Sequence, residues 1–257
     1  MNKNVVDLDD QMLADFKDEA RDIISSLDVH LQNAHSQANR DTLLTAIQRE
    51  VFNLRYKGKS VNAPLINLTS HRLADYVTSC RELNADAIAD IQAFVDKIEG
   101  ILDGDFSGAA TDSAEFVREL PSKRAPDIDP AWLSKANVEA LLVIPQRSMA
   151  AIVERELAAC GYRSSVTHSS FEAIELAVRT RPDFIIVAKT IDDLDGVDVV
   201  NALQAMPKTR DIPTAVLTSD APNHPSLRDL PFRTAIIRKG GAFGDDLAEA
   251  LARFNIT

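Results

Sequence analysis

The side chains best placed for chemistry follow a short apolar run in the second half of the chain. Residues 184–187 have the character of a buried strand, and Ala188 comes directly after them, with Asp195-Gly196 seven residues further on. Open α/β sheets carry their reactive groups at the carboxyl ends of such strands. Alanine has no nucleophile, so we predict that this strand end forms no covalent intermediate.

Other candidate groups do not gather into a site. Asp192, Asp193 and Asp195 fall in the loop beyond the strand end, where we interpret them as a solvated acidic loop. Four histidines have no acids or cysteines at the spacing of metal ligands: His30, His35, His168 and His224. We therefore predict no metal site and no cofactor.

The charge balance argues against nucleic acid as a partner. Lys and Arg total 28 against 39 Asp and Glu, a formal net charge of -11, so no uniformly basic surface is available to neutralise phosphates. Cys80 and Cys160 show no CxxC spacing and fit a reducing compartment. The sequence has no apolar run of membrane-spanning length and no signal-peptide stretch, so we expect a cytoplasmic protein without membrane contact.

The first part of the chain, residues 1–104, reads as an all-α four-helix bundle. Apolar residues recur there at helical spacing, Pro64 suits a first helical turn, and Asn84 suits an N-cap. Four stripes bury one another most simply in an antiparallel bundle. The stripes are Met12, Phe16, Ala20, Ile23, Leu27 and Leu31; Leu44, Ile47, Val51 and Leu54; Ile66, Thr69, Leu73, Tyr76 and Cys80; and Ile88, Ile91, Val95, Ile98 and Leu102.

Residues 105–137 read as a linker of small, polar and proline residues, including Pro121, Pro126 and Pro130. Within this linker, residues 113–120 have the pattern of a short helix. The apolar pair Trp132-Leu133 is predicted to dock on a domain, because a solvated tryptophan would leave a large apolar surface in water.

Residues 138–257 alternate short buried runs with helical stretches, which predicts a doubly wound, parallel, five-stranded α/β sheet. The segment 219–231 contains Pro222, Pro225 and Pro231, so the helix expected there is predicted to be short or replaced by a loop. The predicted strands are 141–144, 164–167, 184–187, 214–217 and 235–237, and the predicted helices are 149–160, 171–180, 197–206 and 245–254.

This second half resembles a response-regulator receiver of the flavodoxin and CheY-like fold. The resemblance rests on Gly161-Tyr162, Pro182-Asp183, Asp195-Gly196, Ile212-Pro213, Thr218 and Lys239. In that family an acidic pair holds magnesium, an aspartate accepts phosphate, and a Thr or Ser and a Lys read the result.

The resemblance implies a pseudo-receiver, because the chemistry-bearing positions have changed. The acidic pair is replaced by Pro145-Gln146, which gives magnesium a poor ligand set, and the acceptor is replaced by Ala188. Thr218 and Lys239 remain, and we interpret them as packing and hydrogen-bonding residues. The alternative is that they respond to another anion or to a partner.

The segment 49–55 in the first half resembles the active helix of a histidine phosphotransfer (HPt) domain. Phe52 then occupies the phosphoacceptor position, Tyr56 replaces a glycine, and Ala74 replaces an acid. Pro64-Leu65-Ile66 and His71-Arg72-Leu73 support this register. A phenylalanine cannot carry phosphate, so the resemblance implies a bundle that has lost its acceptor.

Helical spacing puts Phe52 on a face next to the core stripe, together with Gln48, Arg55 and Lys59. We predict that Phe52 is an exposed contact residue, and that Tyr56 belongs to the same surface. The alternative is that Phe52 folds inward or packs under Tyr56. The basic rim that would suit an acidic partner consists of Arg49, Arg55, Lys57 and Lys59.

We therefore expect a non-enzymatic two-component or phosphorelay protein that binds a receiver, a histidine kinase or a phosphotransferase. The second half would contribute dimerisation or a second partner site through residues 235–237 and 245–254. One alternative is active phosphotransfer with His71 as an unconventional acceptor, although we favour a structural or surface role for this histidine. Another is an architectural homodimer that buries Phe52.

Overall fold

The computed structural model describes residues 3–35, 39–61, 63–106, 112–123 and 138–256, and within them it leaves out the side chains of residues 3–9 and of His35. The chain divides into two compact units, residues 1–121 and 122–257. Most of the predicted linker, including Trp132, lies outside the described residues, so the docking of that side chain stays a prediction.

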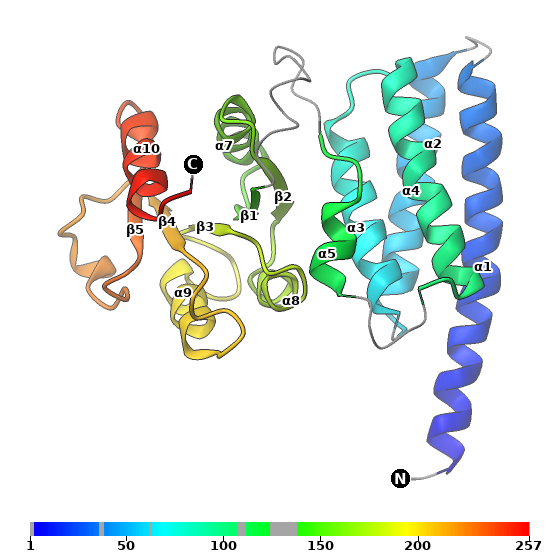
Figure 1. The fold of residues 1–257 in the computed structure, drawn as a ribbon, viewed down its shortest axis with the longest axis horizontal. Coiled ribbons are helices and arrows are strands. Elements are labelled where there is room, and N and C mark those ends of the chain that lie inside the picture. Colours follow the sequence, from blue (N-terminus) through cyan, green and yellow to red (C-terminus); the bar gives the residue numbers. More distant parts are fainter. Residues whose placement is uncertain (1–2, 36–38, 62, 107–111, 124–137, 257) are drawn as a thin grey trace. The chain divides into compact units, whose positions relative to one another are not determined.

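The first unit is the predicted helical bundle (Figure 1). Its helices are α1 (Lys3–His35), α2 (Arg40–Gly58), α3 (Pro64–Ser79) and α4 (Ala85–Asp103). Both α1 and α3 pack against α2 and against α4, which closes the four helices around a shared core. The N-terminal part of α1 extends beyond the other three helices.

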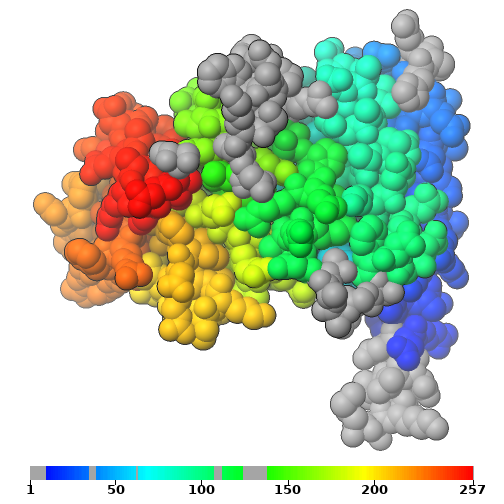
Figure 2. Space-filling model, viewed as in Figure 1, coloured from blue at the N-terminus to red at the C-terminus, as the bar shows by residue number. Residues whose placement is uncertain are grey.

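The four predicted stripes form the core of this bundle, with two exceptions. Met12, in the N-terminal third of α1, is 42% exposed. Cys80 is half-buried at the C-cap of α3. On the face in Figure 2, side chains fill the spaces that the ribbon leaves between the helices.

Local signals in the sequence set the helix ends. Pro64 is the first residue of α3, where a proline ring costs no hydrogen bond. The side chain of Asn84 caps α4 by accepting the backbone N–H of Ala87 at 2.8 Å. Gly104 ends the same helix in the left-handed region, at φ 94°. The predicted N-cap at Asn84 is therefore confirmed.

A fifth helix, α5 (Ser113–Arg118), confirms the short helix predicted within the linker. The side chain of Asp112 accepts a backbone N–H from its first turn at 3.0 Å. The helix packs against α3, and Phe116 is only 4% exposed. The described part of the helical unit therefore continues beyond residue 104.

The second unit is a parallel five-stranded sheet, as predicted. Its strands are β1 (Glu139–Val143), β2 (Arg163–Thr167), β3 (Phe184–Ala188), β4 (Thr214–Thr218) and β5 (Ala235–Arg238). Their order is β2-β1-β3-β4-β5, the strand order of the doubly wound CheY-like fold. In such a sheet the carboxyl ends of β1, β3 and β4 lie side by side.

Among the described residues of this unit, four helices cover the sheet, with α7 and α10 on one face and α8 and α9 on the other (Figure 1). Their bounds are α7 (Arg147–Ala159), α8 (Ser170–Thr180), α9 (Gly196–Ala205) and α10 (Phe243–Arg253). The proline-containing segment between β4 and β5 forms only the 3₁₀ turn η1 (Pro225–Leu227), so the predicted loss of a helix there is confirmed. None of the helices in the described ranges has both the length and the apolar character of a membrane span.

Candidate functional site

Two positions at which the sequence predicted the loss of a functional side chain lie at the carboxyl ends of β1 and β3. Ala188 is the last residue of β3 and is 1% exposed. Pro145 and Gln146 follow β1, and Gln146 is exposed as the N-cap of α7. A hard cation requires oxygen ligands, and neither alanine nor proline supplies a side-chain oxygen.

Thr218 and Lys239 lie at the next two strand ends. Thr218 is the last residue of β4 and is 2% exposed, and its hydroxyl oxygen accepts the backbone N–H of Asp220 at 3.0 Å. The backbone N–H of Lys239 donates to the carbonyl oxygen of Thr218 at 2.8 Å. These bonds support the structural interpretation of Thr218, since its hydroxyl orders the start of the loop after β4.

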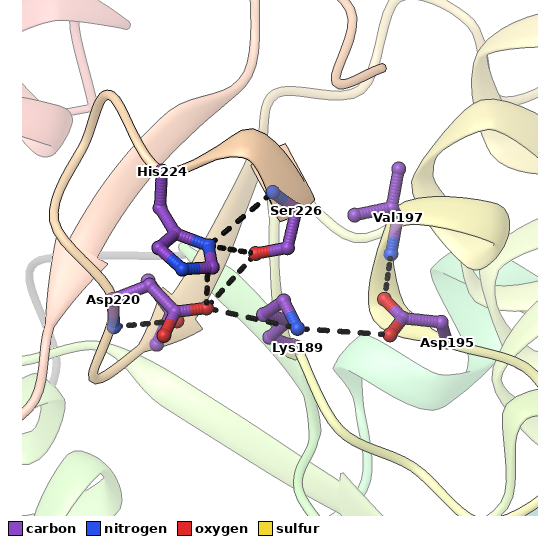
Figure 3. A network of polar contacts seen from close by, with 7 residues as sticks. Lys189, Asp195, Val197, Asp220, His224 and Ser226 are labelled. Carbon is purple, nitrogen blue, oxygen red and sulfur yellow. Dashed lines mark hydrogen bonds and ion pairs between the residues drawn. The ribbon is translucent and has the colours of Figure 1, made fainter. Parts of the chain in front are cut away.

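A lysine that the sequence reasoning missed lies between two carboxylates at this edge (Figure 3). Lys189 directly follows Ala188, and its Nζ is 3.9 Å from Oδ2 of Asp195 and 3.6 Å from Oδ2 of Asp220. The Lys189 side chain is 20% exposed, so its charge is partly removed from water. We name Lys189, Asp195, Asp220, His224 and Ser226 the strand-end network.

The loop after β4 completes the strand-end network. The hydroxyl of Ser226 donates to Oδ2 of Asp220 at 3.0 Å, and Nδ1 of His224 lies 2.7 Å from the same hydroxyl oxygen. The hydrogen bond from Ser226 lowers the pKa of Asp220, and the charges of His224 and Lys189 act in the same direction, while burial opposes them. Asp220 is therefore held as a carboxylate beside the lysine.

The backbone after β3 is fixed by a close approach to the start of α9. The N–H of Gly196 donates to the carbonyl oxygen of Lys189 at 2.7 Å, and the side chain of Asp195 accepts the N–H of Val197 at 3.0 Å. A Cβ on Gly196 would overlap the carbonyl oxygen of Ala188. Asp195 is exposed, as the interpretation of a solvated acidic loop expects, and it is also a helix cap and an ion-pair partner.

The donor set at these strand ends does not fit the magnesium ion that a receiver fold implies. Two of the carboxylates, those of Asp195 and Asp220, face the ammonium of Lys189. Among the described residues, no three His, Cys, Asp or Glu side chains are grouped as metal ligands. A magnesium ion would need several oxygens in octahedral arrangement.

The second candidate site is the outer face of α2, which we name the α2 surface: Arg49, Phe52, Arg55, Tyr56, Lys57 and Lys59. Phe52 is 46% exposed and Tyr56 is 81% exposed, so the prediction of a surface aromatic is confirmed and its inward packing is wrong. Gln48, expected on the same face, is half-buried and donates from Nε2 to the carbonyl oxygen of Val77 at 2.9 Å.

The basic residues of the α2 surface differ in their surroundings. The side chain of Arg49 is 71% exposed, and Lys59 is exposed, whereas Arg55 is half-buried. Lys57 pairs with Glu19 of α1 at 2.7 Å. The predicted basic rim is therefore present, and one of its members is also joined to the neighbouring helix.

An open hollow of about 510 Å³ adjoins the α2 surface between α1 and the end of α2. Both apolar and charged side chains line it. Its lining residues are Met12, Asp15, Phe16, Glu19, Tyr56, Lys57, Lys59, Ser60 and Val61. Tyr56, Lys57 and Lys59 belong both to the hollow and to the α2 surface, so a molecule bound on that surface would reach the hollow.

His71 lies on α3 and is only 4% exposed, so a surface role for this residue is wrong. Phosphoryl transfer between proteins needs an imidazole that a partner can reach. The burial of His71 therefore favours a structural role in the bundle core.

Comparisons with known proteins reach only part of the chain. No family model matches it. It is 38% identical over 79 residues to the transcriptional regulatory protein PrrA of Mycobacterium leprae, a match covering 31% of this chain and 33% of PrrA. PrrA of Mycobacterium tuberculosis is 35% identical over the same length. The chain thus spans about a third of the length of these curated relatives.

Solved receiver domains are also similar to the chain. The receiver domain of the sensor histidine kinase PA1611 from Pseudomonas aeruginosa, solved with a coordinated magnesium ion, is 21% identical, with a TM-score of 0.41. The chemotaxis protein CheY4 of Vibrio cholerae is also 21% identical, with a TM-score of 0.40. Each match covers 46% of this chain and 98% of the solved chain.

Proposed function

We propose that the protein is a non-enzymatic two-component signalling protein that binds a receiver, a histidine kinase or a phosphotransferase through its α2 surface. The observation that carries the proposal is the exposure of Phe52 and Tyr56, at 46% and 81%, on the helix that resembles the active helix of an HPt domain. The bundle would occupy a partner's docking surface without exchanging phosphate with it.

The α2 surface has the composition of a contact surface. Exposed aromatic side chains next to arginine are frequent anchors of protein interfaces. Phe52 and Tyr56 are one helical turn apart and lie on one face, with the exposed side chain of Arg49 beside them. The adjoining hollow offers space for an apolar side chain of the partner. The basic residues of the α2 surface favour a partner with an acidic surface.

The absence of enzymatic activity is part of the proposal. Phe52 and Ala188 stand at the two positions where the resemblances place phosphoacceptors, and neither side chain has an atom that forms a bond to phosphorus. His71, the alternative acceptor, is buried. The bundle and the sheet would then serve as binding modules.

The second unit supports a role for the protein in two-component signalling. Its sheet has the receiver fold, and the partial similarity to a transcriptional regulatory protein supports the same pathway class. In the proposal this unit supplies a second contact, through β5 and α10, either to a partner or to another copy of the chain.

The test is a binding titration of the full chain against a panel of purified receivers and histidine kinase phosphotransfer domains from the same genome. We expect at least one acidic receiver to bind, and Phe52→Asp to weaken that binding about tenfold or more, because an interface anchor contributes on the order of 1.4 kcal/mol or more. Phe171→Asp is the matched control, since Phe171 is also an exposed phenylalanine, at 62%, but lies on α8.

Equal affinity of the wild type and Phe52→Asp for every bound partner would move the contact away from α2. Light scattering separates the remaining alternative. A dimer that Phe52→Asp dissociates would assign the α2 surface to self-association, whereas a dimer that survives this substitution would be consistent with a contact through β5 and α10.

A further inference from the structure

The ammonium of Lys189 places a positive charge between two carboxylates at the strand ends. Its Nζ lies within 4 Å of one carboxylate oxygen on each of two loops, those of Asp195 and Asp220. Like charges at such separations repel each other. A divalent ion at these oxygens would therefore have to displace the lysine.

The backbone aims the lysine at this position. Its N–H donates to the carbonyl oxygen of Leu217 in β4 at 2.9 Å, and its carbonyl oxygen accepts the N–H of Gly196 at 2.7 Å. Lys189 is thus held between a neighbouring strand and the first residue of α9. With the backbone fixed on both sides, the side chain extends to carboxylates from both loops (Figure 3).

Each carboxylate is itself fixed to its own loop. Asp195 caps α9 through the N–H of Val197, and Asp220 accepts the hydroxyl of Ser226. A link from Lys189 to both acids therefore connects the β3–α9 loop, residues 189–196, with the loop after β4, residues 218–226. This link cannot be recognised from the sequence, because the two loops are distant along the chain and only the pairing of β3 with β4 brings them together.

We propose that Lys189 is a tethered cation that replaces a divalent metal ion and holds these two loops together in a single arrangement. The second unit would then keep its strand-end conformation without metal and without phosphate. This inference concerns the sheet domain alone and does not depend on the binding proposed for α2, so each can fail without the other.

Hydrogen exchange of the full chain, followed by mass spectrometry, tests the proposal. Lys189→Met keeps much of the side-chain length but removes the charge. We expect amides in residues 190–197 and 219–228 to exchange about fivefold faster, as for the loss of a partly buried ion pair that stabilises local structure. Lys208→Met, at an exposed lysine between α9 and β4, should leave both segments unchanged.

Asp220→Asn gives the sharper result, because it alters one loop and the readout lies in the other. We expect faster exchange in residues 190–197, which Asp220 contacts through Lys189. A change confined to residues 219–228 would overturn the proposal. This variant also keeps the proposal testable if Lys189→Met fails to fold, which general exchange in β1 and β3 would reveal.

Magnesium chloride provides the remaining arm of the test. We expect millimolar magnesium to leave exchange of the wild-type loops unchanged. Slower exchange of residues 190–197 or 219–228 on adding magnesium would show that the ion still binds there, and would overturn the proposal.

Discussion

The guanidinium of Arg238 holds both carboxylate oxygens of Asp246, with Nε 2.7 Å from Oδ2 and Nη2 2.6 Å from Oδ1. The backbone N–H of Arg238 also donates to Oδ2, at 2.8 Å. Bidentate pairs of this kind fix geometry as well as charge. They join β5 to α10, the two elements for which we propose a second contact.

The first prediction is that Asp246 stabilises the sheet domain in a pH-dependent way. The hydrogen bond from Arg238 lowers the pKa of Asp246, although burial opposes this. The stabilisation is therefore present above the unfolded pKa of about 3.9 and is lost as pH falls through the lower folded pKa. Asp246→Asn should reduce Tm by about 5 °C at neutral pH. The melting temperatures of the two proteins should converge as pH falls below the unfolded pKa of about 3.9, and an unchanged difference would contradict the prediction.

A second prediction concerns the close packing at Gly196. Gly196→Ala should lower the free energy of unfolding by roughly 2 kcal/mol, because its Cβ would overlap the Ala188 carbonyl oxygen and force the backbone to move. Gly244→Ala is the control, since a Cβ there meets nothing within 4 Å. Urea denaturation measures both, and equal stability of the two variants would show that the loop after β3 can relax.

Third, the charge of Arg49 should affect the rate at which a partner associates. Arg49→Glu reverses a charge whose side chain is 71% exposed, so we expect about a tenfold lower association rate with an acidic partner at low salt. Salt screens exposed charges, and the difference from the wild type should shrink in high salt. Surface plasmon resonance at two ionic strengths measures this. A slower rate that persists in high salt would assign Arg49 a direct contact instead.

The fourth prediction follows from the burial of His71. His71→Ala should lower the free energy of unfolding of the bundle by about 2 kcal/mol, because it leaves a cavity in the core. His30→Ala, at a half-buried position on α1, should cost about 0.5 kcal/mol or less. Incubation with a radiolabelled phospho-receiver should label neither the wild type nor His71→Ala. If the wild type carries stable label and the variant does not, the alternative of active phosphotransfer through His71 would be supported instead.

Much of the fold could be predicted from the sequence because burial imposes a period on it. The stripe containing Leu27 and Leu31 and the stripe containing Ile88 and Ile91 repeat at helical spacing, and all four residues are buried. The three prolines after β4 also predicted correctly that no full helix forms between β4 and β5. Such features depend on neighbours along the chain, which a single sequence displays directly.

The strand-end network could not be predicted in the same way. Lys189 and Asp220 are far apart in sequence, and only the pairing of β3 with β4 brings their loops together. The available signal was Lys189 itself, because a charged residue directly after an apolar strand is expected to have a counter-ion nearby. The pairing of Arg238 with Asp246 was missed for a related reason, since a carboxylate in the first turn of a helix usually faces water.

The connection between β4 and β5 contains an exposed position at which the sheet domain can tolerate substitutions and attached groups. Leu227 and Thr234 anchor it in the interior, while between them Phe232 is 95% exposed. Exposed loop positions tolerate insertions and substitutions better than helices packed on a sheet. A fluorophore or an affinity tag attached at residue 232 would therefore leave the sheet intact.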